Sequence, residues 1–207
     1  SDAREVTLQV SNNGSKPALV QAWIDEGDPK STPDQSKVPF MIAPPISRVE
    51  ATKSQTLRIT ALPNASQLNQ KQETVLWLNI LDIPPRPTSK SEDTTPDNFL
   101  QLAIRSRIKF FYRPSSIKED ANLASDKLQW IKSGQSLTVK NPTPFHITMT
   151  SVYQKAGDKK IDLLPQGLMI KPFSEASVQL KNGNLQDMSF INVNDYGGRV
   201  EHPIKLQ

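Results

Sequence analysis

Residues 98–114, with the sequence NFLQLAIRSRIKFFYRP, alternate between bulky apolar residues and polar or cationic ones. One set contains Leu100, Leu102, Ile104, Ile108, Phe110 and Tyr112, and the other contains Gln101, Ala103, Arg105, Arg107 and Lys109. Side chains of a β-strand point to opposite faces in turn, so this period predicts a strand of roughly twelve residues or more, about 40 Å long. Pro114 cannot donate a ladder hydrogen bond and disfavours helix at Arg113, so we expect the strand to end there.

Shorter alternating runs recur on both sides of Pro114 and are separated by turn residues. The chain has 207 residues with 17 prolines and 8 glycines, a composition that favours short strands joined by turns. The best helical candidate, residues 64–72, is short and polar. We therefore predict an all-β protein of two sandwich domains, one over residues 1–113 and the other over 114–207.

The residue types in the chain disfavour an enzyme, a metal-binding protein and an integral membrane protein. There are no cysteines and two histidines, of which His146 is expected to be an ordinary, partly buried side chain, and the net charge of +4 is modest. No catalytic, metal or cofactor site is predicted, and the acidic pair Asp25 and Glu26 is expected to be solvated. No apolar stretch is long enough to span a bilayer.

Nucleic-acid binding is also disfavoured. Arg105, Arg107, Lys109 and Arg113 are the best cationic cluster, but they alternate with apolar residues along one strand and form no broad basic stripe.

Two interpretations of the long strand stay open. It can be a central strand with one core face and one basic face whose side chains snorkel to water. Alternatively it is an edge strand, because it follows segment 84–97, whose polar and charged composition predicts a loop. Proteins normally blunt apolar edges, so an edge that keeps Leu100, Leu102 and Ile104 favours docking of a strand from another chain.

Several motifs, in order along nearly the whole chain, resemble one known family. They are VSNNGSKPALVQAWID, PFMIAPPISRVEATKSQTLRI, NILDIPPRP, IKFFYRP, NPTPFHIT and INVNDYGGR. With them the sequence resembles the periplasmic pilus (fimbrial) chaperones of the chaperone/usher pathway. The resemblance implies two immunoglobulin-like domains in a boomerang arrangement, a periplasmic location and a chaperone with no enzymatic activity. It also implies that the final strand of the first domain is lent to incomplete pilin subunits, which are then delivered to the outer-membrane usher.

The resemblance also assigns residues to these roles. Asn98, Leu100, Leu102 and Ile104 would be the donor positions, with Asn98 at a shallower site. Lys109 would anchor the terminal carboxylate of the subunit, although it lies on the opposite face from the donor residues. Glu73, Arg113 and Asp195 would form an interdomain ionic cluster, and Pro17, Leu19 and Ile83 would form the usher-facing patch.

The sequence departs from the family at its start. The family begins with a strand that ends in a second anchoring residue, an arginine, and this first strand is apparently missing here, so that arginine is unassigned. The remaining alternative is a tandem β-sandwich module that binds a different protein partner. Self-association of the free chaperone through its donor edge is a further expectation.

Overall fold

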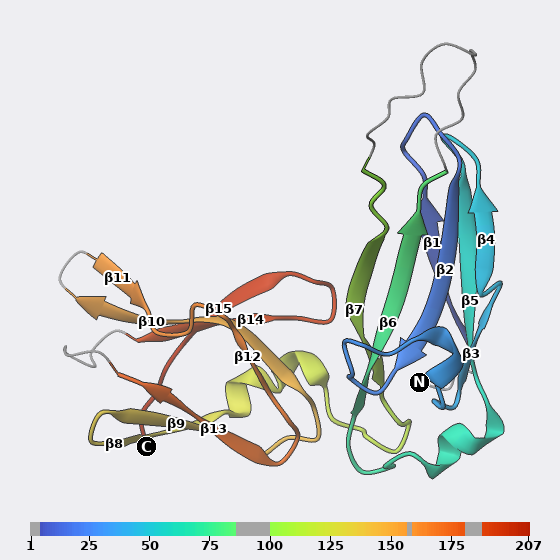
Figure 1. Ribbon diagram of the computed structural model, residues 1–207. Coiled ribbons are helices and arrows are strands. Elements are labelled where there is room, and N and C mark those ends of the chain that lie inside the picture. Colours follow the sequence, from blue (N-terminus) through green and yellow to red (C-terminus); the bar gives the residue numbers. More distant parts are fainter. Residues whose placement is uncertain (1–4, 86–99, 157–158, 181–187) are drawn as a thin grey trace, which may run out of the picture. The chain divides into compact units, whose positions relative to one another are not determined.

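The computed structural model describes residues 5–85, 100–156, 159–180 and 188–207 (Figure 1). These residues form two compact units: the described parts of Ser1–Leu68 and Thr74–Tyr112 make one, and Asn69–Glu73 with the described parts of Arg113–Gln207 make the other. The predicted domain boundary after Arg113 stays a prediction, and by its contacts Arg113 belongs with the second unit.

The first unit consists of two antiparallel sheets with the strand orders β1-β5-β3 and β4-β2-β6-β7. Its strands are β1 (Glu5–Ser11), β2 (Ala18–Asp25), β3 (Phe40–Ala43), β4 (Ile46–Val49), β5 (Ser54–Ala61), β6 (Thr74–Ile83) and β7 (Ile104–Tyr112). Two short 3-10 helices, η1 (Pro33–Gln35) and η2 (Pro63–Gln67), lie in the connections. In this sheet order β7 occupies an edge.

Alternation along the strands builds the core of the first unit. In β5, Leu57 and Ile59 are buried while Arg58 between them is exposed. The core cluster joins residues from both sheets: Ala22, Ile24, Val38, Ile42, Leu57, Ile59, Leu76 and Leu78. Apolar residues at every second position therefore give each sheet one buried face.

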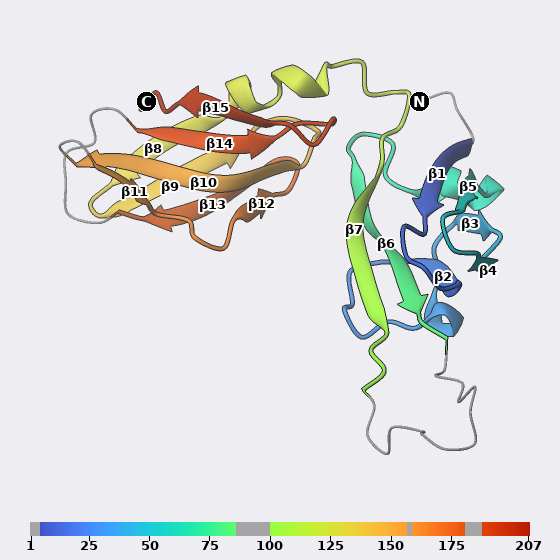
Figure 2. The ribbon, with the colours of Figure 1, turned by 90° about the horizontal axis from the view of Figure 1, so that it is seen from above.

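The second unit also has two antiparallel sheets, one ordered β13-β9-β8 and the other β11-β10-β14-β15 with β12 added to β10. Its strands are β8 (Gln129–Ser133), β9 (Ser136–Asn141), β10 (Ile147–Ala156), β11 (Lys159–Asp162), β12 (Leu168–Ile170), β13 (Ser174–Gln179), β14 (Ser189–Val193) and β15 (Arg199–Pro203). The 3-10 helices η3 (Ala121–Leu123) and η4 (Ser125–Lys127) precede them. Figure 2 shows β10, β14 and β15 running side by side.

Aromatic side chains fill the core of the second unit. Trp130 of β8 and Phe190 of β14 are each 2% exposed, with ring centroids 5.3 Å apart. Phe145, Leu137 and Met149 belong to the same buried cluster. The two units thus have separate hydrophobic cores.

The predicted fold class is confirmed, and strands form on both sides of Pro114 as the alternating runs predicted. The four-residue strand β4 was missed, because it follows Pro44-Pro45 directly and is too short to show alternation. The best helical candidate, residues 64–72, overlaps η2, a 3-10 helix that ends at Gln67. The long strand was predicted to start near residue 98, but β7 starts at Ile104.

We expect Leu57→Ala to lower the free energy of unfolding of the first unit by about 2–5 kcal/mol, because Leu57 is 1% exposed and its removal leaves a cavity. Met41→Ala is the control, since Met41 is 51% exposed. Urea unfolding followed by tryptophan fluorescence measures both. Equal effects of the two substitutions would contradict the assigned core.

Candidate functional site

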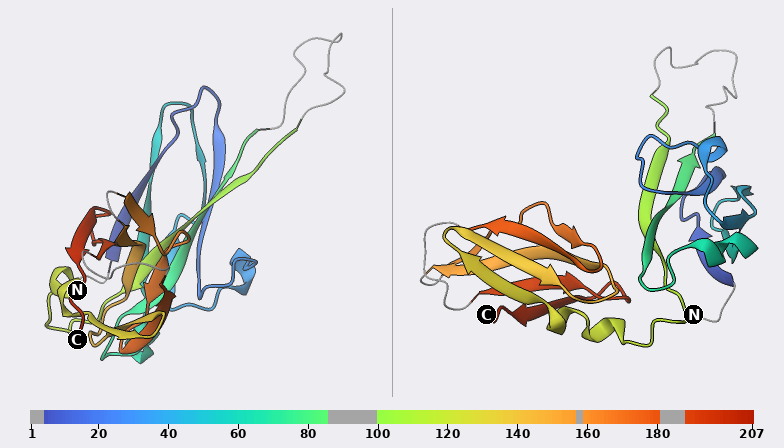
Figure 3. Two further views of the ribbon diagram at one scale, coloured as in Figure 1. Left: turned by 90° about the vertical axis from the view of Figure 1, so that its left-hand side faces the viewer. Right: turned by 90° about the horizontal axis from the view of Figure 1, so that it is seen from below.

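The unpaired edge of β7 is the main candidate site. β7 pairs with β6 from Ile104 opposite Asp82 to Tyr112 opposite Thr74, and the views in Figure 3 show the two strands adjacent along their length. Within the described parts of the chain, no strand pairs with the other edge of β7. Its outward backbone N–H and C=O groups are therefore available to a further strand.

The shorter length of β7 has a simple cause. β6 ends at Ile83 and is followed by Pro84-Pro85, which cannot donate hydrogen bonds to a neighbouring strand. Among the described residues, 100–103 consequently have no partner strand, although the Gln101 side chain donates a hydrogen bond to the Pro84 carbonyl oxygen at 2.7 Å. Of the predicted donor residues that the structure describes, Leu100 and Leu102 thus lie before β7, whereas Ile104 pairs with Asp82 of β6.

The predicted donor residues are strongly exposed. Leu100 is 83% exposed, Leu102 61% and Ile104 63%, and Ile108 on the same face of β7 is 49% exposed. Asn98, the remaining donor position, lies outside the described residues. Four large aliphatic side chains in one row are therefore left in water, an arrangement that favours coverage by a partner.

The core-facing side of β7 changes character along the strand. Towards its end, Phe110 and Tyr112 contact Phe40 with ring centroids 5.1 and 5.8 Å apart. Phe110 also packs against the core cluster, whereas Ile104 and Ile108 on the same side stay exposed. One end of β7 is thus fastened into the first unit while the other presents its apolar row.

The opposite side of β7 carries the three cations, stacked on two indole rings. The Arg105 guanidinium lies 5.7 Å from the ring centre of Trp23, and the Arg107 guanidinium lies 4.4 Å from that of Trp77. The Lys109 ammonium is 6.0 Å from the same Trp77 ring. These distances are those of cation–π contacts, so the basic face is packed rather than fully solvated.

Asp25, at the end of β2, neutralises Arg107. The Arg107 guanidinium lies 2.6 Å from Asp25 Oδ1, and the Asn79 amide donates to Asp25 Oδ2 at 2.7 Å. Gly27, with a φ of +123° that suits glycine, donates its backbone N–H to Asp25 Oδ1 at 2.6 Å. Asp25 is only 3% exposed, so its prediction as a solvated carboxylate was wrong.

The pKa of Asp25 reflects opposing influences. Burial raises the pKa. The hydrogen bonds from Arg107, Asn79 and the Gly27 N–H, together with the charge of Arg107, lower it by more than burial raises it, so the net pKa lies below 3.8. Burial also lowers the pKa of the Lys109 ammonium. The packing on this face of the sheet therefore changes the pKa of both Asp25 and Lys109.

The ionic cluster predicted around Arg113 is assembled within the second unit. Arg113 lies 2.7 Å from Glu73 Oε1 and 2.8 Å from Asp195 Oδ2. Glu73 is 2% exposed and also accepts the backbone N–H of His146 at 2.8 Å. Burial lowers the pKa of Arg113, but its hydrogen bonds to Asp195 and Glu73 outweigh burial and raise it.

The residues of the predicted usher-facing patch share one area of the first unit. Leu19 of β2 lies opposite Ile83 of β6, and Pro17 precedes β2 by one residue. Leu19 is 42% exposed. The Asn12 amide donates to the carbonyl oxygens of Lys16 and Val49 at 2.8 and 3.0 Å, which holds the turn before Pro17.

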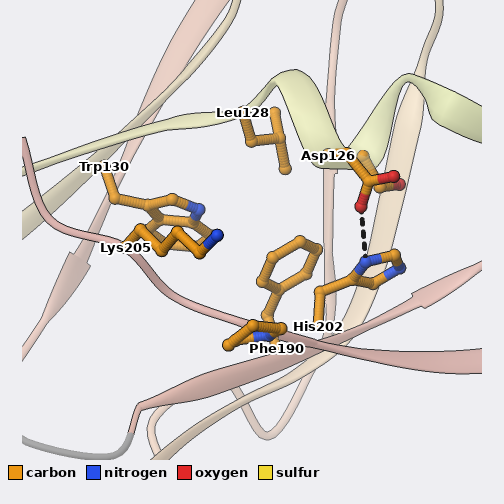
Figure 4. Close-up of a pocket in the computed structure, with 8 residues that line it drawn as sticks. Asp126, Leu128, Trp130, Phe190, His202 and Lys205 are labelled. Carbon is orange, nitrogen blue, oxygen red and sulfur yellow. Dashed lines mark hydrogen bonds and ion pairs between the residues drawn. The ribbon is translucent and has the colours of Figure 1, made fainter.

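A small cavity of ≈190 Å³ in the second unit was not expected from the sequence. Figure 4 shows Asp126, Leu128, Trp130, Phe190, His202 and Lys205 around it. His202 Nδ1 lies 3.0 Å from Asp126 Oδ1, and its Nε2 lies 3.0 Å from Asn192 Oδ1. The Ser125 hydroxyl accepts from the Asn192 amide at 2.6 Å, and both ring nitrogens of His202 already contact Asp126 and Asn192, so the imidazole is not positioned as a base for this hydroxyl.

The described residues contain no group of three or more histidine, aspartate or glutamate side chains arranged to hold a metal ion. In the same residues there is no helix long and apolar enough to cross a membrane.

Comparison with known families gives two matches that together cover nearly all of the chain. Residues 1–118 match "Pili and flagellar-assembly chaperone, PapD N-terminal domain". Residues 123–204 match "Pili assembly chaperone PapD, C-terminal domain".

Individual relatives agree with these matches. The chaperone protein MrkB of Klebsiella pneumoniae is 42% identical over 199 residues, which are 95% of this chain and 82% of the relative. The crystal structure of the CupB2 chaperone of Pseudomonas aeruginosa superposes with a TM-score of 0.81 at 35% identity and covers 99% of this chain and 94% of that one. The SafB chaperone of Salmonella enterica, solved in complex with the SafA pilin, has a TM-score of 0.73 at 31% identity and covers 95% and 86% of the two chains.

We expect Asp25→Asn to lower the free energy of unfolding of the first unit at neutral pH by about 3 kcal/mol, because Arg107 then lacks its buried partner. Since the folded pKa of Asp25 is below 3.8, its stabilisation is complete above that pH and is lost as the pH falls through the folded pKa. The difference between wild type and variant should therefore shrink in acid. Urea unfolding at several pH values measures it, with the exposed Asp82→Asn as control; a difference independent of pH would contradict the assignment.

Proposed function

The chain belongs to the family of pilus-assembly chaperones, and we propose that it captures pilin subunits in the periplasm by pairing the open edge of β7 with a subunit strand. The family is one of chaperones and not of enzymes. The observation that carries the proposal is the edge strand β7, preceded by a segment with no partner strand and lined by an exposed apolar row. A relative solved with its pilin supports the class of partner.

Two kinds of interaction would hold the subunit. Backbone hydrogen bonds along the edge of β7 are independent of the partner's sequence and suit a chaperone that serves several subunits. Leu100, Leu102 and Ile104 would each contribute roughly 1.5–3 kcal/mol on burial in a subunit groove. Asn98 is proposed as a further, shallower contact.

Lys109 is proposed as the anchor for the terminal carboxylate of the subunit. Its ammonium lies on the opposite face from the donor residues, beside Trp77, where burial has already removed part of its hydration. An incoming carboxylate would bind this ammonium through a charge-assisted hydrogen bond. Because only one register brings the carboxylate to Lys109, the anchor would also select the register of strand pairing.

The two other groups of residues are proposed to bind the usher and to fix the position of the chain after β7. Pro17, Leu19 and Ile83 are proposed to contact the outer-membrane usher, and Glu73, Arg113 and Asp195 are proposed to hold the chain where β7 leaves the first unit. Arg113 directly follows β7, so its ion pairs restrain the end of the donor strand. In the free protein the exposed apolar row is proposed to be covered by self-association.

We expect Leu102→Glu to abolish recovery of a co-expressed pilin subunit, since a carboxylate would have to enter an apolar groove without a partner. Leu123→Glu is the matched control, because Leu123 is 54% exposed and lies in the second unit. Lys109→Ala should reduce recovery about tenfold or more, as expected for loss of a charge-assisted hydrogen bond. Undiminished recovery of the subunit with a folded Leu102→Glu variant would contradict strand capture. Undiminished recovery with Lys109→Ala would contradict only the assignment of Lys109 as the anchor.

Leu19→Glu should separate subunit capture from usher binding. It places a charge in the proposed usher-facing patch but leaves β7 unchanged, so the purified complex with the subunit should form normally. Binding of that complex to the purified cognate usher should fall about tenfold or more. Loss of subunit capture, or normal usher binding, would contradict the assignment of the patch.

A further inference from the structure

Little of the start of β7 is buried on its core-facing side. Ile104 is 63% exposed and Ile108 is 49% exposed, and Phe110 packs against the core cluster only towards the other end of the strand. Before β7, Leu100 and Leu102 are 83% and 61% exposed. Packing in the core therefore does little to fix the direction in which the donor side chains point.

Arg105 fastens the start of β7 on the opposite side. Its guanidinium donates to the Ser31 carbonyl oxygen at 3.3 Å through Nη1 and to the Pro29 carbonyl oxygen through Nη2. The same group lies 5.7 Å from the ring centre of Trp23 on β2. A planar guanidinium holds its donors at a fixed spacing, so it can bridge two carbonyl oxygens more rigidly than an ammonium on a flexible stem. Arg105 thus joins β7 to the loop between β2 and β3.

Hydrogen bonds within that loop hold the two carbonyl groups in place. The Lys30 N–H donates to Asp28 Oδ1 at 2.8 Å, and the Ser31 N–H donates to the Asp28 carbonyl oxygen at 3.1 Å. Ser31 is 7% exposed, and the Ser36 hydroxyl donates to the Ile24 carbonyl oxygen of β2 at 2.6 Å. Asp28 therefore closes the turn that presents both carbonyl oxygens to β7.

A second contact holds the same polar side of the chain before β7. The Gln101 amide donates to the Pro84 carbonyl oxygen at 2.7 Å, and Leu102 and Ile104 lie between Gln101 and Arg105 in the sequence. Because side chains alternate along an extended chain, holding the polar side directs the apolar side away from it. A donor segment that is already extended loses less conformational entropy when it pairs with a subunit.

We propose that Arg105 is a positioning residue for subunit capture, which holds the start of β7 against the carbonyl groups of Pro29 and Ser31 so that the apolar row is aligned before a subunit binds. This inference rests on the proposed function. Arg105 acts through the backbone of β7 and need not touch the subunit. The loop between β2 and β3, to which no subunit contact is assigned, thereby becomes part of the capture site.

A double-mutant cycle tests the link between Arg105 and the loop, with the affinity for a purified pilin subunit diluted from denaturant as the readout. We expect Arg105→Gln to weaken binding about tenfold and Asp28→Ala about fivefold, because each loosens the same contact from one side. The double variant should bind within about twofold of Arg105→Gln alone, since the contact is already lost. Asp28→Asn keeps an acceptor for the Lys30 N–H and should bind like wild type. Multiplied losses in the double variant would mean that Arg105 acts independently of the loop, and would overturn the proposal.

NMR relaxation of the backbone amides shows whether Arg105 orders the free donor segment. Order parameters of residues 102–104 should lie near the rigid value of about 0.85 in wild type and fall below about 0.6 in Arg105→Gln. Arg58→Gln is the matched control, because Arg58 is an exposed arginine of β5 that pairs with Glu5 at 3.2 Å. A merely structural role for Arg105 predicts a lower urea midpoint than that of the control with unchanged order parameters, and this result would overturn the proposal.

Circular dichroism checks the folding of each variant. Should Arg105→Gln not fold, Asp28→Ala alone decides the matter: binding about fivefold weaker with mobile residues 102–104 supports the proposal, and wild-type binding overturns it. Leu102→Glu, measured alongside, separates this inference from the proposed function. If Leu102→Glu loses the subunit while Arg105→Gln binds like wild type, only the inference is overturned. If folded Leu102→Glu binds like wild type, strand capture fails and the inference fails with it.

Discussion

The pairing of β7 with β6, and the point at which it stops, governs the candidate site. β6 ends at Ile83 because Pro84-Pro85 cannot extend the ladder, so residues 100–103 have no neighbouring strand while Ile104–Tyr112 are held on one side. The chain thus has a strand whose end is anchored by Phe110 and Tyr112 and whose start is available. Strand donation requires both properties, since a loose strand would lose entropy on binding and a fully paired one could not bind.

The outer face of the same sheet supplies the rigidity. Two indole rings and the buried carboxylate of Asp25 engage the basic residues of β7, so the strand is restrained on its polar side as well as on its core side. Arg105 also donates to the carbonyl oxygens of Pro29 and Ser31 in the loop after β2. A pre-organised donor strand costs less entropy when a subunit binds, which favours affinity without any dependence on the partner's sequence.

Alternation and proline positions in the sequence were sufficient to predict the all-β fold and the two faces of β7. They did not predict where β7 begins, because the donor segment has the same alternation as the paired segment and differs only in lacking a partner strand. The burial of Asp25 was missed for a related reason. Its partners Arg107 and Asn79 are more than fifty residues away in sequence, and such pairing depends on sheet order.

Asp25 and Trp77 carry no local signal of their roles. The sequence Asp25-Glu26-Gly27 is typical of a solvated turn, and a tryptophan within a strand is typically a core residue. The strand registers explain both roles, since Asp25 lies opposite Trp77 in the β2–β6 pair, and Trp77 lies opposite Lys109 in the β6–β7 pair. Knowledge of the antiparallel pairing of β2 with β6 and of β6 with β7 would therefore have been enough to predict the cluster.

Amide hydrogen exchange of residues 100–112, compared between the free chaperone and its complex with a pilin subunit, tests strand capture most directly. In the free protein, the amides of β7 that point to β6 should be protected, while those that point away and those of residues 100–103 should exchange fast. On binding, the outward amides and alternate amides of residues 100–103 should become protected. Binding that leaves these amides in fast exchange would mean that the subunit contacts side chains only, and would contradict strand pairing at this edge.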